Sequence, residues 1–173
     1  MKPPRADRRC SSRLAAATTL LVFAAGAVAA GLTVEPKLLP PEQAFRFSAR
    51  ALDARTLEAR FDVVDGYYLY RDKIGFSVEP DVGAAQPELP RGIRKHDDFF
   101  GDVETYRGRV VVRVPLARGA AGQALVLKAD SQGCADAGVC YPPTRQEVKL
   151  SLPASGARPG PIVEPARRKG LFN

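Results

Sequence analysis

Residues 45–66 read FRFSARALDARTLEARFDVVDG, and this stretch decides the fold class. Apolar side chains occupy every second position in two runs, one over residues 45–51 and one over residues 57–63. A period of two is the side-chain period of a β-strand, so each run predicts a strand that buries one face. The dipeptide Asp65-Gly66 follows and favours a tight turn. The stretch therefore predicts two neighbouring strands and a turn.

The rest of the chain continues this strand-like pattern. The aromatic run YYLY (67–70) follows the turn, and a Pro/Gly-rich connection covers residues 80–92. Further strand candidates lie at residues 73–80, 110–116, 124–129 and 147–152. After residue 30, no segment of ten or more residues shows the helical period of 3.6. Short strands separated by Gly and Pro predict an all-β fold, an antiparallel β-sandwich.

The two ends of the chain differ from its middle in composition. Residues 1–30 begin with a basic segment and continue with an apolar, Ala-rich run that ends at Ala30, the layout of a cleaved secretory signal peptide. We therefore expect an exported protein whose folded domain spans residues 31–153. The chain then becomes rich in Pro, Gly, Ala and basic residues, which predicts a disordered tail over residues 154–173.

The formal net charge of +7 comes from these two ends. Residues 31–157 hold 17 basic and 17 acidic side chains, so the expected domain is neutral. Nucleic-acid-binding domains are commonly strongly basic and gather Lys and Arg on one face. On composition, nucleic acid is therefore excluded as an expected partner.

A cysteine pair is the strongest candidate for chemistry. Once the predicted signal peptide is removed, two cysteines are left, Cys134 and Cys140, in the segment SQGCADAGVCYPP (131–143). In an oxidising compartment two such cysteines are expected to pair. Two glycines in the segment allow the chain to turn back, as a disulfide needs, since its Cα atoms are usually about 4.4–6.8 Å apart.

Spacing alone leaves two interpretations of this pair open. A lone disulfide in a secreted domain is commonly structural. A loop this short, however, removes little entropy from the unfolded chain and stabilises by less than the ~3 kcal/mol of a fifteen-residue loop. A disulfide in a small, Gly-rich loop is also more readily exchanged. The residues themselves favour neither a structural disulfide nor a redox-active one.

Other clusters give weaker signals. A closed zinc site needs four ligands, which the single histidine, His96, and two cysteines supply poorly, so no metal or other cofactor is expected. We interpret His96 as a surface side chain. The segment HDDFFG (96–101) reads as an exposed loop whose rings reach the core, or as a lid over the disulfide. Tyr68 and Tyr70 share one strand face, for which core packing is the default explanation.

Four stretches of the sequence resemble one known family, the N-terminal periplasmic domain of the thiol:disulfide interchange protein DsbD. They are PPEQAFRF (40–47), DGYYLYRDKI (65–74), HDDFFG followed by ETYR (96–107), and QGCADAGVCYPP (132–143). Their order and spacing cover nearly the whole of residues 31–152. The cysteine motif with its trailing YPP is highly specific.

The resemblance implies a fold and roles for the site residues. The implied fold is all-β: an immunoglobulin-like antiparallel β-sandwich with a small inserted β element that carries the redox cysteines. Cys134 and Cys140 would be the cycling disulfide, with Cys140 forming mixed disulfides and Cys134 resolving them. The implied cap-loop and site-lining residues, with Phe99 in the shielding position, are Asp97, Asp98, Phe99, Phe100, Tyr68 and Tyr70. Acids near the pair, including Asp136, are expected to disfavour a thiolate by like-charge repulsion.

Two residues and the chain length depart from the family pattern. Asp98 stands where Glu is usual, and Phe100 where Tyr is usual, which removes a hydroxyl hydrogen bond. Proteins of the family continue into a multi-helix membrane domain and a thioredoxin-like domain, whereas this sequence stops at Asn173. We therefore expect a free-standing version or a separate membrane partner.

The resemblance also implies a function, a cellular location and partners. It implies periplasmic thiol–disulfide exchange, with protein-disulfide reductase activity as an electron relay. The expected upstream partner is a membrane-embedded thiol donor of the DsbD type or a thioredoxin-like domain. Expected acceptors are a periplasmic disulfide isomerase or a thioredoxin of cytochrome c maturation. The alternative from another class is a non-catalytic immunoglobulin-like binding module with a structural disulfide; a third, a metallochaperone, would bind metal through the reduced pair.

Overall fold

The computed structural model describes residues 37–84, 86–97, 100–154 and 156–166. The predicted signal peptide, residues 1–30, and the predicted cap residues Asp98 and Phe99 lie outside these ranges. Residues Pro36–Asn173 form a compact unit of their own. Within the described ranges, we find no helix with the length and apolar character needed to cross a membrane.

Strands dominate the described residues. They are β1 (Phe45–Ala51), β2 (Thr56–Val63), β3 (Tyr67–Tyr70), β4 (Gly75–Glu79), β5 (Ile93–Asp97), β6 (Gly101–Tyr106), β7 (Gly108–Pro115), β8 (Ala124–Ser131), β9 (Gly133–Ala135) and β10 (Thr144–Ser151). Two single helical turns complete the elements, α1 (Pro41–Ala44) and the 3-10 turn η1 (Arg71–Lys73).

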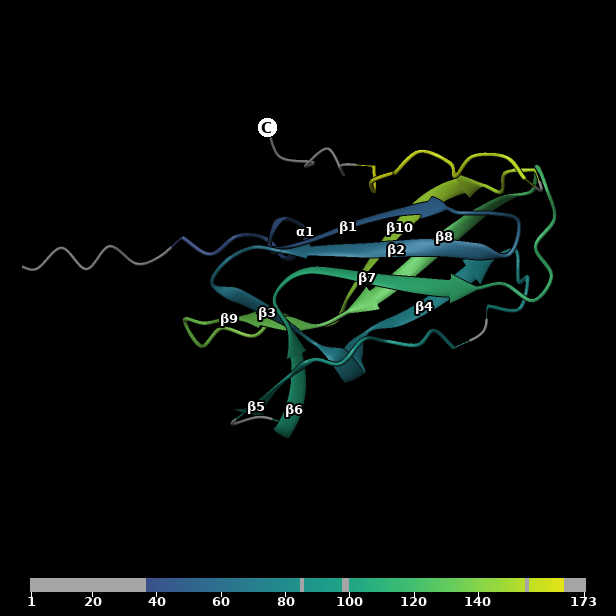
Figure 1. Ribbon diagram of the computed structural model, residues 1–173. Coiled ribbons are helices and arrows are strands. Elements are labelled where there is room, and N and C mark those ends of the chain that lie inside the picture. The colour runs from purple at the N-terminus through teal and green to yellow at the C-terminus, as the bar shows by residue number, and fades with distance from the viewer. Residues whose placement is uncertain (1–36, 85, 98–99, 155, 167–173) are drawn as a thin grey trace, which may run out of the picture. The chain divides into compact units, whose positions relative to one another are not determined.

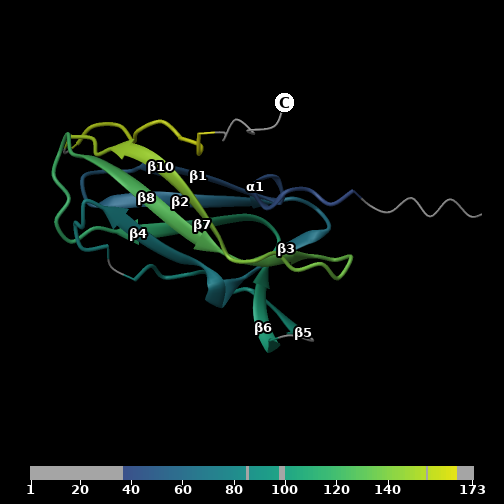
Figure 2. The same ribbon diagram turned by 180° about the vertical axis from the view of Figure 1, so that it is seen from behind.

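Six strands form two antiparallel sheets that pack as a sandwich. One sheet has the order β1–β2–β7 and the other the order β4–β8–β10. Eight Cα pairs join β2 to β7, and eight join β8 to β10. Figure 1 is seen from the side of the first sheet, and Figure 2 shows the second sheet in front.

The period-two pattern produces the core that the sequence predicts. Phe47 and Phe61 are cross-strand partners, their ring centroids lie 5.1 Å apart, and both are buried. From the opposite sheet, the paired residues Leu127 and Val148 are buried in the same core. Burying one such side chain stabilises the fold by about 1.5–3 kcal/mol. The predicted all-β antiparallel sandwich is confirmed, and β7, β8 and β10 match predicted strands.

A third sheet, of four strands in the order β5–β6–β3–β9, is the inserted β element at one end of the sandwich (Figure 1). The chain enters it through the predicted turn at Asp65-Gly66, where Gly66 has φ +83°. β3 pairs with β6 on one side and with β9 on the other, and all four residues of YYLY (67–70) are buried. A strand covered on both faces explains this continuous aromatic run, which shows no alternation.

The segment after β10 differs in part from the predicted disordered tail. Ala49 and Val163 exchange two backbone hydrogen bonds of 2.9 and 2.7 Å, and the Gly160 N–H donates to the Ala51 carbonyl at 2.8 Å. Residues 156–166 thus follow the free edge of β1. An edge strand presents unpaired backbone groups, and an extended segment satisfies them without any side-chain pattern that the sequence would reveal.

Candidate functional site

The two cysteines face each other across a short hairpin that begins with β9. Backbone hydrogen bonds of 2.8 and 3.0 Å close the hairpin on either side of the pair. Cys134 and Cys140 form an antiparallel bridge between these bonds, and their sulfurs form a disulfide with Cα atoms 4.0 Å apart. Directly opposed residues at such a position lie about 4.5 Å apart in antiparallel strands. The hairpin register therefore brings the two cysteines together.

Two glycines give the hairpin its shape. Gly138 ends the turn with φ +85°, and its N–H donates to the Ala135 carbonyl at 3.0 Å. This left-handed conformation suits a three-residue hairpin loop and favours glycine. Gly133 is needed for another reason, because a Cβ there would clash with the Tyr68 carbonyl oxygen and lie 2.7 Å from the Phe45 ring. Gly133 thus lets β9 lie directly on β3 and the core.

The two cysteines differ in exposure. Cys134 is 0% exposed and joins Tyr68 and Tyr70 in a small buried cluster separate from the main core. Cys140 is half-buried, and its neighbour Val139 is exposed. Of the two cysteines, Cys140 is therefore the one in contact with solvent.

Tyr70 places a hydroxyl group beside the disulfide. Its Oη lies 3.1 Å from Cys134 Sγ and 3.9 Å from Cys140 Sγ, and it donates a hydrogen bond of 2.7 Å to Asp97 Oδ2. Burial and, secondly, the hydrogen bond to Asp97 raise the pKa of Tyr70 far above its ordinary value. The phenol therefore stays protonated, and its one proton points to Asp97. Oxygen lone pairs are left to face the Cys134 sulfur.

Asp97 is a buried carboxylate at the end of β5, only 4% exposed. Its Oδ2 accepts hydrogen bonds from Tyr68 at 3.1 Å and from Tyr70, and it lies 3.5 Å from Lys95 Nζ. Its Oδ1 accepts from the backbone N–H of Phe100 at 3.3 Å. A buried charge is tolerated when several donors surround it. Asp97 therefore ties the start of the cap loop to both tyrosines.

Lys95 and Arg107 enclose Tyr68, and sequence reasoning missed both. Lys95 Nζ donates to the Tyr68 hydroxyl at 2.6 Å and lies 3.9 Å from the ring centroid, and the Arg107 guanidinium lies 5.2 Å from the same centroid. Desolvation works against the ammonium charge, but the hydrogen bonds to Tyr68 and Asp97 outweigh it and raise the pKa of Lys95. The contacts form a continuous line, here named the polar chain: Lys95–Tyr68–Asp97–Tyr70–Cys134. One signal in the sequence could have indicated Lys95. It lies two residues before Asp97, and residues two apart in a strand share a face.

Arg107 also fixes the turn of the cysteine hairpin. Its guanidinium donates two hydrogen bonds to the Asp136 carboxylate, at 2.6 and 2.9 Å, and a third to the Tyr67 carbonyl at 3.2 Å. The hydrogen bond to Arg107 lowers the pKa of Asp136. Asp136 is therefore paired with Arg107 and is not a lone charge beside the disulfide, and its effect on a nearby thiolate stays a prediction.

Of the four predicted cap residues, the structure describes Asp97 and Phe100. The Phe100 ring meets Tyr70 edge-on, with centroids 5.0 Å apart, and Lys73 Nζ lies 4.8 Å from its centroid. At this position, where the family usually has a tyrosine, Phe100 makes a ring contact with Tyr70. The shielding role of Asp98 and Phe99 stays a prediction, since both lie outside the described residues.

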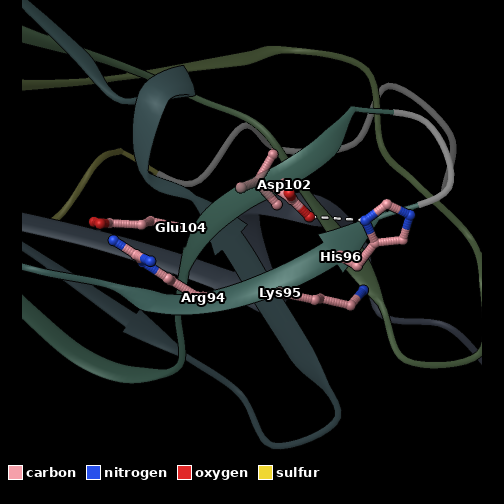
Figure 3. A pocket seen from close by; sticks show the side chains of 6 residues that line it. Arg94, Lys95, His96, Asp102 and Glu104 are labelled. Atoms are coloured by element: carbon pink, nitrogen blue, oxygen red, sulfur yellow. Dashed lines mark hydrogen bonds and ion pairs between the residues drawn. The ribbon is translucent and has the colours of Figure 1, made fainter.

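The other face of the β5–β6 ribbon carries exposed charged side chains (Figure 3). His96 Nδ1 lies 2.8 Å from Asp102 Oδ1, and Arg94 and Glu104 form the next cross-strand pair. His96 is thus on a strand, exposed as expected. Among the described residues, no group of three His, Cys, Asp or Glu side chains is arranged to hold a metal ion.

Comparisons with known proteins give one consistent match. A family model described as "Thiol:disulfide interchange protein DsbD, N-terminal" matches residues 35–152. The thiol:disulfide interchange protein DsbD of Ralstonia nicotianae is 42% identical over 153 residues, which cover 87% of this chain and 24% of that protein. DsbD of Escherichia coli K12 is 36% identical over 156 residues, covering 88% and 27%. The chain therefore spans about a quarter of the length of these curated relatives.

Two solved structures share the fold. The crystal structure of the Neisseria meningitidis DsbD N-terminal domain in the reduced form is 35% identical, with a TM-score of 0.63 over 75% of this chain and 96% of that one. A complex between the DsbD N-terminal and PilB N-terminal domains from the same organism gives 38% identity and a TM-score of 0.56, covering 65% and 87%. The immunoglobulin-like β fold implied by the sequence resemblance is confirmed.

Proposed function

Because the chain belongs to the family of the N-terminal domain of the thiol:disulfide interchange protein DsbD, we propose that it exchanges disulfides through Cys134 and Cys140. The setting of the pair carries the proposal: Cys140 is half-buried, Cys134 is fully buried, and a protonated tyrosine touches the buried sulfur. Labile disulfides are those that a thiolate can reach. A disulfide that only braced the fold needs neither the access nor the tyrosine.

The protein takes up reducing equivalents in two steps. A donor thiolate attacks Cys140 Sγ in line with the S–S bond, the donor–Cys140 bond forms, and Cys134 leaves as a thiolate that takes up a proton. A second donor thiol then attacks the donor sulfur of this mixed disulfide. The donor departs as a disulfide, and Cys140 is released as a thiol. Two electrons and two protons have passed to the pair.

Delivery to an acceptor reverses the direction. The Cys140 thiolate attacks one sulfur of the acceptor disulfide and forms a mixed disulfide, while the other acceptor sulfur leaves and is protonated. Cys134 then attacks Cys140, which displaces the reduced acceptor and restores the Cys134–Cys140 bond. Cys140 is thus proposed as the partner-facing cysteine and Cys134 as the resolving one.

Tyr70 is the group placed to respond to charge on Cys134. When Cys134 leaves, its sulfur faces the lone pairs of the hydroxyl 3.1 Å away, whose proton is directed to Asp97, so the thiolate is disfavoured and takes up a proton. In the resting dithiol, the Cys134 S–H donates to the Tyr70 oxygen while Tyr70 donates to Asp97. A hydrogen bond made by the neutral form disfavours the charged form. The polar chain therefore keeps the resting thiol protonated and slow toward unselected disulfides.

We propose that this exchange takes place in the periplasm. There the protein would act as a protein-disulfide reductase that relays electrons from a donor to an acceptor. The proposed donor is a membrane-embedded thiol protein of the DsbD type or a thioredoxin-like domain. The proposed acceptors are a periplasmic disulfide isomerase and a thioredoxin of cytochrome c maturation. The solved complex of a relative with a PilB N-terminal domain supports docking of a folded partner domain.

Single-cysteine variants test the assignment. Cys134→Ala should accumulate mixed disulfides with a donor or acceptor, because the resolving thiol is missing and Cys140 is reachable. Cys140→Ala should accumulate none, since Cys134 is buried. The measurement is non-reducing electrophoresis after acid quenching, with the wild-type chain as the control. Equal trapping by the two variants contradicts the assignment.

A redox titration with melting curves separates exchange from the structural alternative. An immunoglobulin-like binding module braced by this disulfide predicts a low reduction potential and marked destabilisation on reduction. Disulfide exchange predicts a reduction potential within the range of cellular thiol pairs. It also predicts that the oxidised and reduced proteins melt at nearly the same temperature.

We propose Asp98, Phe99 and Phe100 as a lid over the disulfide. Phe99→Ala and Phe100→Ala should each speed reduction by a small thiol such as dithiothreitol, because a ring no longer covers the sulfurs. Ile93→Ala is the matched control, since Ile93 is exposed on the same ribbon. Reduction rates that equal the wild-type rate in both Phe variants remove the lid from the mechanism.

A further inference from the structure

The two outer faces of the sandwich differ in charge. The outward positions of β1, β2 and β7 carry five arginines and two acids, a net charge of +3: Arg46, Arg50, Arg60, Arg109 and Arg113 with Glu58 and Asp62. We name this surface the arginine face. The outward positions of β4, β8 and β10 carry equal numbers of both signs: Lys128, Arg145 and Lys149 with Glu79, Asp130 and Glu147. The neutral composition of the domain conceals this asymmetry.

The strand register arranges the arginine face in rows. Two rows run across the three strands, Arg46–Asp62–Arg109 and Arg50–Glu58–Arg113. Between them, Arg60 is the cross-strand partner of Val111, which is 41% exposed. Outward residues of one strand lie about 6.6–6.8 Å apart, and strands about 4.7–4.9 Å. Guanidinium groups therefore form an array across the three strands, with one exposed apolar side chain at its β7 edge.

The two acids neutralise only part of this array. Glu58 contacts two arginines at 3.0 and 3.3 Å, and Asp62 contacts a third at 2.7 Å. The other two, Arg46 and Arg113, are exposed and make no ion pair with any residue that the structure describes. A third acid, Glu164, lines the same surface pocket as Arg46 without an ion pair to it. Arg46 and Arg113 are therefore available to an anionic ligand.

We propose that the arginine face binds the anionic phospholipid headgroups of a membrane surface. A guanidinium group binds phosphate through paired hydrogen bonds, and basic side chains at a bilayer are attracted by its negative potential. An array spread over one sheet face can meet several headgroups at once, and Val111 on the edge strand β7 supplies an apolar contact. No outward position of these three strands holds an aromatic ring, which single-stranded nucleic acids need for base stacking.

The position of the arginine face suits this docking. The cysteine hairpin lies at the end of the sandwich and not on the face of the β1–β2–β7 sheet (Figure 1), so a bilayer against that face leaves Cys140 open to a partner. The segment 156–166 follows the β1 edge of the face, and the sequence continues with Arg167, Arg168 and Lys169. Headgroup binding by this face is independent of the proposed exchange activity.

Vesicle co-sedimentation tests the proposal with the chain from Gly31, since Pro36–Asn173 form a compact unit. The chain should bind vesicles of phosphatidylglycerol in phosphatidylcholine, should not bind pure phosphatidylcholine, and should be released by salt.

The triple variant R46Q/R109Q/R113Q should lose about fivefold in binding for each arginine removed. The matched control K128Q/R145Q/K149Q changes the net charge equally on the other face and should bind like the wild type. A single variant, Val111→Asp, places a negative charge within the array and should weaken binding even if the triple variant fails to fold.

Several results overturn the proposal. They are absence of wild-type binding to the anionic vesicles, equal losses in the two triple variants, and unchanged binding by Val111→Asp. Complete loss of binding in R167Q/R168Q/K169Q, with full binding by a chain mutated only on the face, assigns the affinity to the tail instead. Binding to polyglutamate as tight as to the vesicles shows a general acidic partner and not a phosphate headgroup. Melting curves of every variant establish which chains are folded.

Discussion

The sandwich and the four-stranded sheet at its end are both antiparallel, yet they are stabilised in different ways. In the sandwich, long registers set apolar side chains inward, as with Phe47 against Phe61, and charged side chains outward. In the four-stranded sheet, two residue pairs join β3 to β6 and three join it to β9. The interior there is polar, because Asp97 and two tyrosines bind one another beside the buried Cys134.

The difference shows how stability and chemistry are divided within one small domain. Burying an unpaired polar group in a hydrophobic core costs free energy, whereas a group that must respond to charge on a sulfur has to be polar and close. The sandwich holds most of the buried apolar side chains, and the polar chain is satisfied by its own members and by the Phe100 N–H. Substitutions in the two regions should therefore have separable effects.

The largest effect on stability should come from the sandwich core. Phe61→Ala removes a fully buried ring and should lower the free energy of unfolding by about 3–5 kcal/mol. Urea unfolding measures this, and Val111→Ala on the same sheet, exposed, should change it by less than about 0.5 kcal/mol. The reduction potential of the folded fraction should not change. A shifted potential would break the division between the two regions.

Gly133→Ala should show where the two regions meet. The added methyl group clashes with the Tyr68 carbonyl and the Phe45 ring, so we expect a loss of about 3 kcal/mol and faster reduction of the disulfide. Gly138→Ala is the control in the same hairpin, with open space but φ +85°, and should cost about 1–2 kcal/mol. Equal losses in urea unfolding would mean that contact with the core does not matter.

Tyr70→Phe should act mainly on chemistry. It removes a donor to the buried Asp97, at a cost of about 1–3 kcal/mol, and removes the acceptor for the Cys134 thiol. The pH profile for alkylation of the reduced Cys134 should therefore move to lower pH. Tyr67→Phe is the matched control, because the Tyr67 hydroxyl on the same strand bonds to the Leu39 N–H and not to the polar chain. Identical profiles for both variants would remove Tyr70 from the mechanism.

The smallest effect should be that of the exposed ion pair at the hairpin turn. The pKa of Asp136 is lowered below 3.8 in the folded state, so the pair stabilises above that pH, and its contribution is lost as the pH falls through the folded pKa. Both side chains are nearly half exposed, at 41% and 48%, so solvent screening limits the contribution to about 0.5–1 kcal/mol. Arg107→Gln should therefore lose stability near neutral pH, and the difference from wild type should shrink toward pH 3 and in high salt. Thermal melts across pH measure this.

Much of the fold could be predicted because its signals are local. Alternation in residues 45–51 and 57–63, together with the Asp65-Gly66 turn, defines strands whose buried faces the structure confirms. The cysteine motif and its flanking stretches were specific enough to indicate the family. These features depend on residues that are close in the chain. In a strand, residues two apart point to the same face of the sheet, so the spacing alone predicts which side chains are buried.

The contacts of the site could not be predicted in the same way. Lys95 reaches Tyr68 across 27 residues, and Arg107 reaches Asp136 across 29, and no spacing within one strand reports either contact. The docking of residues 156–166 on β1 rests on backbone hydrogen bonds, which leave no side-chain pattern. The arginine face needs the register of three strands, because net charge sums over both faces of the sandwich.

The sequence by itself determined the all-β class, the predicted export and the single cysteine pair, because each is encoded in composition or short-range periodicity. Only the tertiary structure decided which cysteine is buried, which groups touch its sulfur and where the arginines gather. These depend on how strands far apart in the chain align, and a shift of one residue in register would turn every one of those side chains to the other face. The cysteine pair was visible from the outset, but its surroundings became defined only when β3, β5 and β9 came together.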